Sequence, residues 1–597
     1  MGSLRKKNNI IVRFIGLYWL QYVMGILFLI LSAYVQAYNP KLLGIIIDLL
    51  KAQSIDRQQV IYNLGLLILV ALLAFATRYI WRYFIIGNAR NLECYLRQEL
   101  FKHFQTLPVS FYNNRKTGDL MAYAINDVSA VRMAFGPATA MIINGVGLST
   151  ISIISMVQSV NLKLTVMSLL PIPIILFAMI KIGLLVQRRF KEVQESFGAV
   201  SDRVQENISG IRVIKAYVQE QQEVENFEAL NERMKQANLR MVRVSSLLSP
   251  MIEVCFGISF MINLIYGSSL VRSGVITLGD FVAFNGYLAM IMTPIISVGR
   301  IISLTQKGVA SYKRLKEILT QKTDITDERA DKTLTEIKGD LEVTGLSFKY
   351  PGCEDYALKD IHIKLEKGKT LGIIGKTGSG KTTLVNLLLR LYKLPEDSIK
   401  IGGRDMEEYP LEILRDAIGY VPQDNFLFSA TIKENIGFFK NIYTEEEIEN
   451  AAKLSCVYDN IKNFPKGFDT VIGERGVNLS GGQKQRISIA RAILKKPELL
   501  ILDDALSAVD TKTEEEIIGN FNQILKDKAG IIIAHRISAL KHADEIILLD
   551  GGKIAERGTH EELLAKQGEY YEIYQEQFRE EMRRRVEDET KQHFSAS

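Results

Sequence analysis

The chain has 597 residues, of which 47% are hydrophobic and 23% are charged, so it is long enough to form several domains. Its formal net charge of +6 is small for this length and gives no indication of a nucleic-acid partner. The four cysteines lack the spacing of metal ligands, which indicates isolated reduced thiols: Cys94, Cys255, Cys353 and Cys456.

The first half of the chain contains six apolar stretches, each close to the length of about 20 residues that a membrane-spanning helix needs. They cover about 14–35, 62–86, 136–158, 164–186, 247–271 and 281–302. The N-terminus is basic and lacks a small-residue cleavage site, so we interpret the first stretch as an uncleaved span. We expect an all-α, six-helix transmembrane domain over residues 1–315 and a linker over 316–338.

Two connections between these stretches are long and charged: about 50 residues separate the second from the third, and about 60 separate the fourth from the fifth. Their apolar residues recur at helical spacing, as at Val204, Ile208, Ile211 and Ile214, so we expect the spans to continue as long helices. Lys and Arg crowd these connections and the N-terminus. The positive-inside rule therefore predicts a multi-pass plasma-membrane protein with both termini and the C-terminal domain in the cytoplasm.

Several polar residues lie inside the apolar stretches, and each allows two interpretations. Arg78 and Arg82 share a helix face and either line a cavity or extend to the inner membrane surface. Glu253, Asn144 and Asn263 either face a path for cationic amphiphiles or form hydrogen bonds between helices. One aromatic set could contact apolar compounds, although ordinary packing explains it equally well: Tyr18, Trp19, Tyr22, Phe256, Phe260 and Tyr266.

The second half of the chain begins with a mixed α/β pattern and contains a phosphate-binding loop. An apolar strand leads into this loop, and a helix follows it, in the order Gly375, Lys376, Thr377, Gly378, Ser379, Gly380, Lys381, Thr382 and Thr383. The glycines allow backbone N–H groups to surround phosphates at the start of the helix. We expect Lys381 to reach the β- and γ-phosphates and the Thr382 hydroxyl to bind Mg²⁺. The sequence predicts an α/β P-loop nucleotide-binding domain over 339–575 and a charged tail over 576–597.

Two further motifs complete the nucleotide chemistry. The apolar strand that ends in Asp503 places this carboxylate to hold Mg²⁺ from the opposite side. Ser480, Gly481, Gly482 and Gln483 precede another helix, and a helix start is a site for anions. Because the chain already has its own phosphate loop, this second site indicates a partner's nucleotide.

Leu479–Gln483 resembles the signature of ATP-binding-cassette (ABC) proteins, and the other motifs of that family follow in order. The resemblance implies that Tyr350 stacks on adenine, that Gln423 contacts Mg²⁺ and water, and that His535 senses the γ-phosphate. Ser507–Asp510 is similar to the loop that crosses the family's dimer interface.

With six spans ahead of one cassette, the whole chain resembles an ABC exporter half-transporter. Residues 471–476 resemble the exporter segment that touches the intracellular helices. Residues 111–128 and 208–217 resemble the family's two coupling regions, the second of which is expected to dock on the partner's cassette. The resemblance implies ATP and Mg²⁺ as ligands, a lipid bilayer, and a second half-transporter as partner.

Asp504 stands where many ATPases of this kind have a glutamate that handles the attacking water. Asp is one methylene shorter, which withdraws its carboxylate by roughly 1.5 Å in a site where a misplacement of about 1 Å can cost about 10²-fold. We expect this chain's own site to bind ATP and hydrolyse it slowly, as in the degenerate-site subunit of bacterial heterodimeric multidrug exporters. Gln423 and His535 are intact, so residual hydrolysis at Asp504 is also expected.

The sequence favours an ATP-driven exporter of drugs or other amphiphilic compounds that works by alternating access. Three alternatives stay open: an active homodimer in which Asp504 is competent, a lipid or peptide cargo, and a regulatory subunit that binds ATP without turnover. The six predicted spans exclude a soluble ATPase of DNA repair. The fusion of spans and cassette in one chain disfavours an importer.

Overall fold

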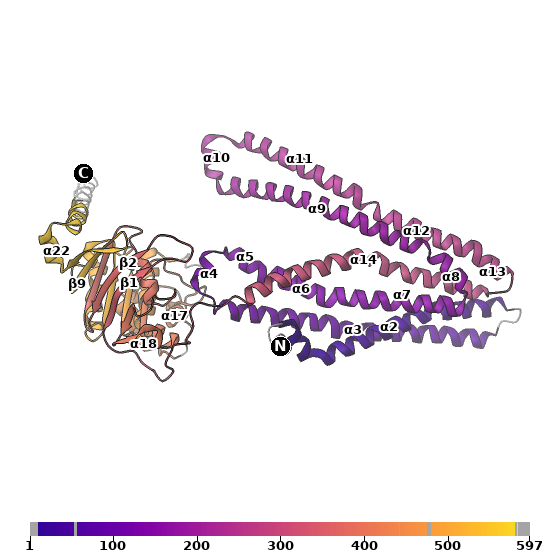
Figure 1. Ribbon diagram of the computed structural model, residues 1–597, viewed down its shortest axis with the longest axis horizontal. Coiled ribbons are helices and arrows are strands. Elements are labelled where there is room, and N and C mark those ends of the chain that lie inside the picture. Colours follow the sequence, from indigo (N-terminus) through magenta and orange to yellow (C-terminus); the bar gives the residue numbers. More distant parts are fainter. Residues whose placement is uncertain (1–9, 53–55, 441, 474–478, 580–581, 583–597) are drawn as a thin grey trace. The chain divides into compact units, whose positions relative to one another are not determined.

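The computed structural model describes residues 10–52, 56–440, 442–473, 479–579 and 582. The chain divides into two compact units (Figure 1). The first, here called the membrane unit, comprises Met1–Thr106 and Lys116–Gln321. The second, the cassette unit, comprises Leu107–Arg115 and Lys322–Ser597.

The membrane unit is all helical, as the sequence predicts. Within the described residues, six helical segments are long and apolar enough to cross a membrane: Ile10–Lys51, Arg57–Phe104, Thr117–Gln158, Leu162–Ser209, Glu220–Arg272 and Leu278–Leu319. Each contains one of the six apolar stretches, and each is longer than its stretch. The prediction of six apolar helices with long extensions is therefore confirmed.

Three short π-helical turns interrupt two of these segments, Thr117–Gln158 and Glu220–Arg272, so these two consist of several elements. The helices are α2 (Ile10–Lys51), α3 (Arg57–Phe104), α5 (Thr117–Ala122), η1 (Tyr123–Asp127), α6 (Val128–Met133), η2 (Ala134–Ala138), α7 (Thr139–Ser159), α8 (Leu162–Leu169), α9 (Pro171–Ser209), α10 (Ile211–Tyr217), α11 (Glu220–Ser245), α12 (Leu248–Ile262), η3 (Asn263–Gly267), α13 (Ser268–Arg272) and α14 (Leu278–Leu319).

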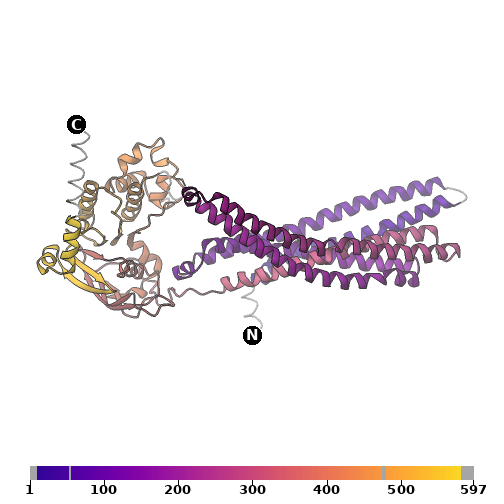
Figure 2. The same cartoon turned by 90° about the horizontal axis from the view of Figure 1, so that it is seen from above.

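Helices α9 and α11 run side by side, and the short helix α10 joins the C-terminal end of α9 to the N-terminal end of α11 (Figures 1 and 2). The turn ends at Val218, whose left-handed backbone (φ 52°) reverses the chain into α11. Apolar side chains on α10 are exposed, with 61% of Val213 and 73% of Tyr217 accessible. An exposed apolar helix of this kind is typical of a docking element.

Small residues allow α2 and α14 to approach each other closely. A Cβ atom at Gly279 would lie 2.1 Å from the carbonyl oxygen of Gly44, so neither position has room for a side chain. The Asp48 carboxylate also accepts a hydrogen bond of 2.7 Å from the Gly279 N–H in the first turn of α14. Close backbone approach at glycine is a common way for membrane helices to associate.

The cassette unit is an α/β domain with two sheets. A four-stranded antiparallel sheet has the order β2-β1-β4-β5, and a six-stranded sheet has the order β10-β9-β3-β8-β7-β6. The strands are β1 (Leu341–Phe348), β2 (Leu358–Leu365), β3 (Thr370–Gly375), β4 (Ile399–Ile401), β5 (Arg404–Asp405), β6 (Ile418–Val421), β7 (Leu499–Asp503), β8 (Ala529–Ile533), β9 (Glu545–Asp550) and β10 (Lys553–Gly558).

Strands β3, β7 and β8 are buried along their whole length, because helices cover both faces of this parallel part of the sheet. The helices of the unit are α4 (Val109–Asn113), α15 (Lys381–Leu388), η4 (Met406–Glu408), α16 (Leu411–Ala417), α17 (Ile432–Gly437), α18 (Glu445–Leu454), α19 (Tyr458–Lys462), η5 (Gly467–Asp469), α20 (Gly481–Leu494), α21 (Thr511–Ile524), η7 (Ile537–Ala539) and α22 (His560–Lys566).

Helix α20 belongs to two packed clusters at once. Ile487, Ala490 and Leu494 pack with α17, α18 and α19, whereas Ile489 and Ile493 pack against the six-stranded sheet. This alternation follows the helical period, which places residues three or four apart on one face. Helix α20 is therefore fixed both to the six-stranded sheet and to helices α17, α18 and α19.

Candidate nucleotide-binding site

Four parallel strands deliver the predicted site residues to one edge of the six-stranded sheet. Strands β3, β8, β7 and β6 are neighbours in this order, so their carboxyl ends meet at the same edge. Gly375 ends β3, His535 follows β8, Asp503 and Asp504 lie at the end of β7, and Gln423 follows β6. The topology thus gathers residues that lie far apart in the sequence.

The phosphate loop has a backbone that other residues could not easily adopt. Gly378 and Gly380 have left-handed φ angles of 83° and 105°. A Cβ atom at Gly380 would also lie 2.8 Å from the Ala357 carbonyl oxygen and 2.7 Å from the Leu358 side chain. These glycines are required for the loop to turn into the start of α15.

Lys381, the first residue of α15, is buried and folds back onto its own loop. Its Nζ donates hydrogen bonds of 2.6 Å to the Gly375 carbonyl and 2.9 Å to the Lys376 carbonyl. Burial lowers the pKa of Lys381, and the charges of Asp503 and Asp504 oppose this shift. A buried ammonium without a full anionic partner is ready to bind phosphate oxygens.

Asp503, Thr382 and Ser379 form a polar set that fits phosphate and Mg²⁺. Asp503 is 2% exposed, and its Oδ2 has no hydrogen-bond partner among the residues that the structure describes; Ser379 Oγ is also buried and has none among them. Burial raises the pKa of Asp503, and the Asp504 charge raises it further, while Lys381 and a hydrogen bond with Thr382 oppose this. Buried polar atoms normally have partners, so these two mark a place for an ion or ligand.

Asp504 directly follows β7 and has a left-handed backbone with φ 50°. Its N–H donates a hydrogen bond of 2.9 Å to the Ile533 carbonyl of β8, and its carbonyl accepts from Ser507 Oγ at 3.0 Å. The side chain is half-buried beside Asp503. Asp adopts a left-handed conformation more readily than Glu, so the backbone here suits the residue present.

Tyr350 lies just beyond β1, and its hydroxyl is 2.9 Å from Thr383 Oγ1 in the first turn of α15. The predicted adenine-stacking residue is therefore beside the phosphate loop. Lys376 and Thr377 are exposed on the loop's outer side, where Lys376 pairs with Glu569 at 2.7 Å.

Gln423 and His535 are both exposed. Two residues that sequence reasoning missed, Arg491 and Gln577, form hydrogen bonds with the backbone near them. Arg491 donates hydrogen bonds to the carbonyl of Phe426, in the segment after Gln423, at 3.2 Å and to that of Asn435 at 2.8 Å. Burial lowers its pKa to about 10. The side-chain amide of Gln577 donates to the His535 carbonyl at 2.7 Å. No motif marks Gln577, which lies beyond the predicted domain.

Ser480 caps α20, which begins at Gly481, so the expected helix is present and already includes the last three residues of the motif. Its hydroxyl accepts from the Gln483 N–H at 3.3 Å, and the Gln483 side chain accepts from the Ser480 N–H at 3.0 Å. Gly482 has no room for a side chain, because a Cβ atom would lie 2.8 Å from the Ala508 carbonyl oxygen. The cassette unit thus has two candidate nucleotide surfaces: the phosphate-loop face, which is Gly375–Thr383 with Asp503 and Asp504, and the signature face, which is Ser480–Gln483.

Within the described residues, no hydrogen bond or ion pair joins the signature face to Gly375–Thr383. Gln485, which sequence reasoning missed, instead joins α20 to the loop after β7. Its amide donates to Ser507 Oγ at 3.1 Å and accepts from the Ala508 N–H at 3.0 Å. Of the segment predicted at 471–476, residues 474–476 lie outside the described part of the chain.

The polar residues of the membrane unit have different surroundings. Asn263 is fully buried and donates to Asn285 at 2.9 Å, which fits the helix–helix interpretation. Asn144 is half-buried. Glu253 is exposed on α12 and has no hydrogen bond or ion pair with the described residues. Arg82 lies over the Trp81 ring at 5.6 Å.

Comparisons with known proteins identify the family. A family model described as the ABC transporter transmembrane region matches residues 22–295, and one described as ABC transporter matches residues 358–507. A relative in Bacillus subtilis, probable multidrug resistance ABC transporter ATP-binding/permease protein YheI, is 41% identical over 94% of this chain and 96% of its own length. The chain belongs to the ABC transporter family.

Two other relatives cover similar lengths of this half-transporter. The multidrug resistance-like ATP-binding protein MdlA of Escherichia coli is 35% identical over 94% of each chain, and an ATP-dependent lipid A-core flippase of Photobacterium profundum is 32% identical over 87% of each. A solved bacterial Atm1-family ABC exporter with ATP bound superposes with a TM-score of 0.78 at 24% identity, over 93% of this chain and 99% of that one. The predicted fold, a six-helix membrane domain and an α/β nucleotide-binding domain of the exporter type, is confirmed.

Proposed function

We propose that this half-transporter pairs with a non-identical second half to export amphiphilic compounds across the plasma membrane. In this pair, its own phosphate-loop face hydrolyses ATP slowly and its signature face completes the partner's active site. The ABC family and exporter fold already imply ATP-driven transport across a membrane. The observation that carries the finer proposal is Asp504 next to Asp503 at the end of β7, in a chain whose Ser480–Gln483 signature is complete.

The residues of the phosphate-loop face divide the work at the proposed site. Lys381 and the loop N–H groups would hold phosphate oxygens, and the Thr382 hydroxyl and Asp503 carboxylate would hold Mg²⁺. The ion held by these two residues would offset the negative charge of the phosphate oxygens. The Asp504 carboxylate is one methylene short of the place from which it would orient a water molecule, and this slows hydrolysis without weakening the hold on ATP.

Membrane orientation follows from charge. Lys and Arg crowd the N-terminus and the long connections between spans, so both termini and the cassette unit face the cytoplasm. The α10 turn then lies on the cytoplasmic side with exposed Val213 and Tyr217, as a docking element for the partner's cassette would.

The decisive experiment purifies this chain through an affinity tag, once alone and once as the complex isolated from its source cells, and measures ATPase rates in lipid nanodiscs. We expect the chain alone to bind ATP but to hydrolyse it far below the usual transporter rate of about 1–10 s⁻¹. The complex is expected to reach that rate and to contain a second half-transporter with Glu after its own strand aspartate. Full hydrolysis by the native chain alone contradicts the heterodimer and supports an active homodimer.

The Asp504→Glu variant locates the deficit within the same assay. We expect a gain of about ten-fold or more in the chain alone, because the carboxylate then reaches the water. The matched control Asp504→Asn keeps the size and removes the charge, and it is expected to abolish residual hydrolysis. If the Glu variant gains nothing although it binds ATP, the missing partner rather than the methylene limits the rate.

For the cargo, we propose cationic amphiphiles. Glu253 is the one carboxylate in the six predicted apolar stretches, it is exposed on α12, and it lacks a partner in the described chain. A lone acid at membrane depth is costly unless it has a function. In Glu253→Gln we expect the KM of a cationic dye to rise about ten-fold, because one charge-assisted contact is lost. The KM of a neutral dye is expected to stay unchanged.

A lipid cargo is the second candidate, and the lipid A-core flippase among the relatives favours it. The transport assay separates the two, because Glu253→Gln would then leave dye transport unchanged for both dyes. A flippase would also move a fluorescent lipid between leaflets in an ATP-dependent manner.

A further inference from the structure

The three residues Arg390, Leu391 and Tyr392 follow directly after α15, the helix that begins with Lys381 of the phosphate loop. Two stretches outside the family's cassette match fold with the cassette unit: Leu107–Arg115 and the linker that starts at Lys322. The first attaches to Tyr392 and the second to Arg390. They are also the stretches through which the chain enters and leaves the helices of the membrane unit.

Tyr392 holds the first of these stretches. Its hydroxyl accepts a hydrogen bond of 2.9 Å from the side-chain amide of Asn113, at the end of α4. The two residues are 279 positions apart in the sequence, and Tyr392 is only 5% exposed. A buried hydroxyl that loses its partner costs free energy, so this contact fixes the position of α4 on the domain.

The ring of Tyr392 also contacts the residue expected to stack on adenine. Its centroid lies 5.1 Å from that of Tyr350, edge to face, and Tyr350 in turn contacts Thr383 beside the phosphate loop. Tyr350 is therefore shared between the nucleotide site and Tyr392. A nucleotide stacked on Tyr350 would therefore lie one ring contact away from Tyr392, which in turn contacts Asn113.

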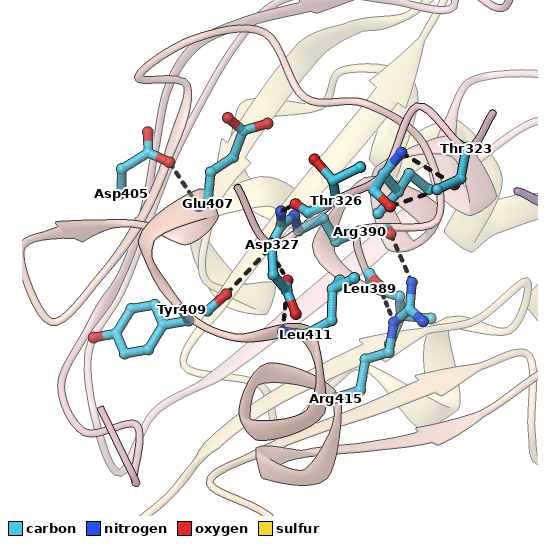
Figure 3. Close-up of polar contacts among 11 residues, drawn as sticks. Thr323, Thr326, Asp327, Leu389, Arg390, Asp405, Glu407, Tyr409, Leu411 and Arg415 are labelled. Carbon is cyan, nitrogen blue, oxygen red and sulfur yellow. Dashed lines mark hydrogen bonds and ion pairs between the residues drawn. The ribbon is translucent and has the colours of Figure 1, made fainter. Parts of the chain in front are cut away.

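Arg390 holds the second stretch (Figure 3). It is 3% exposed, and its guanidinium donates to the Thr326 carbonyl of the linker at 2.7 Å and to the Tyr409 carbonyl at 3.1 Å. Asp327 lies 3.8 Å from the same guanidinium and accepts from the Leu411 N–H at 3.1 Å. The linker is thus fixed to the residue two positions before Tyr392.

Room for movement exists at this point. A cavity of about 370 Å³ borders Tyr392, Arg390, Thr326 and Arg329. Close-packed cores resist rearrangement, whereas side chains beside a cavity can move without disturbing the rest of the domain.

We infer that Tyr392 is a positioning residue that couples ATP occupancy of the phosphate-loop face to Asn113 and so to the membrane helices, while Arg390 fixes the linker to the same point. This inference rests on the proposed function in one respect, namely that this chain's own site binds ATP. The slow site then has a role of its own, because ATP that stays bound there continuously determines the position of Asn113.

The test compares variants in the assembled exporter in nanodiscs. Tyr392→Phe removes only the hydroxyl, Asn113→Ala removes the donor, and the double variant removes both. The matched control is Tyr409→Phe, because Tyr409 is also a buried tyrosine of this domain and its hydroxyl donates to the Ile401 carbonyl at 3.0 Å, away from Asn113. Three quantities are measured: basal ATPase rate, its stimulation by a cationic dye, and the Kd of a fluorescent ATP analogue.

We expect stimulation of the ATPase rate by the dye to fall about five-fold in each single variant, because this is the contribution of about one buried hydrogen bond. The Kd of the ATP analogue is expected to stay unchanged within about twofold. The double variant is expected to equal either single one, because both remove the same contact. The control is expected to keep its stimulation. If Tyr392→Phe behaves like Tyr409→Phe, or if the two single effects add, the inference is wrong.

Failure of the proposed function has a different signature. It would show as full ATP turnover by the native chain alone, whatever the Tyr392 variants do. Loss of ATP binding in Tyr392→Phe would mean that the residue supports the site itself, which also overturns the coupling inference.

Discussion

The phosphate-loop face and the signature face differ in what they keep of the family pattern. The signature face has its full capping box and the glycine that packs on Ala508. The phosphate-loop face has the residues expected to hold phosphate and metal, but Asp504 stands where the family pattern is expected to have a glutamate. In the proposed heterodimer, the chain has kept the signature face, which completes the partner's site, and has changed the residue at Asp504, which acts in its own site. The proposed function therefore requires that binding and hydrolysis be separable within one site.

The largest expected effect comes from the signature face. Gly481→Asp places a carboxylate in the first turn of α20, where a Cβ atom meets only the Ala508 methyl group at 3.4 Å, so the domain should fold. The new charge repels the partner's phosphates, and ATPase activity of the complex is expected to fall by about 10²-fold or more. ATP binding by this chain alone should stay unchanged.

The matched control is Gly481→Ala, which adds the same Cβ atom without a charge and is expected to keep most activity. If Gly481→Asp leaves hydrolysis intact, the signature face does not complete a working site. The comparison between the two faces would then fail.

The phosphate-loop face should give a smaller effect on the complex. Lys381→Ala is expected to abolish ATP binding by this chain, because it removes the buried ammonium at the loop. Hydrolysis by the complex should fall only about 5- to 10-fold, an ordinary coupling between two sites, because turnover takes place on the partner. The assay measures ATP binding to the isolated chain and hydrolysis by the complex.

Lys369→Ala serves as the control, because Lys369 is an exposed lysine just before β3 that pairs with Asp544. It should change neither quantity. Complete loss of hydrolysis in Lys381→Ala would indicate two equivalent sites. Both the phosphate-loop face and the signature face of this chain would then take part in hydrolysis.

Much of this arrangement could be predicted from sequence, because its signals are local. Six apolar stretches and a glycine-rich loop between a strand and a helix each lie within about 25 consecutive residues. The order of the parallel strands then brings His535, Asp503 and Gln423 to one edge.

Contacts between distant residues could not be predicted in this way. Tyr392 and Asn113 are 279 positions apart, and nothing in either local sequence indicates the other. The same holds for Gln577, whose amide supports the His535 backbone from beyond the predicted end of the domain. Residues 107–115 lie within the predicted transmembrane domain by sequence, yet they fold with the cassette unit. The spacing of apolar residues indicates a helix, but not the domain on which that helix packs.

The smallest expected effect concerns the link between the two faces. Gln485 is buried, and it joins α20 to Ser507 and Ala508 in the loop that follows Asp504. Gln485→Leu leaves the Ala508 N–H without an acceptor, so we expect a loss of about 1–3 kcal/mol in stability of the domain. Hydrolysis by the complex should fall about two- to three-fold, because the signature helix is held less firmly behind Gly482.

The control for this link is Gln485→Glu, which can still accept from the Ala508 N–H but cannot donate to Ser507 Oγ. It is expected to restore most of the stability and only part of the activity, as measured by thermal unfolding and ATPase rate on the same preparations. If the Leu and Glu variants are equally active and both fall below the native complex, the acceptor for the Ala508 N–H has no part in hydrolysis, and the whole loss belongs to the donor to Ser507. If both are as active as the native complex, Gln485 only stabilises the fold, and the two faces act without this connection.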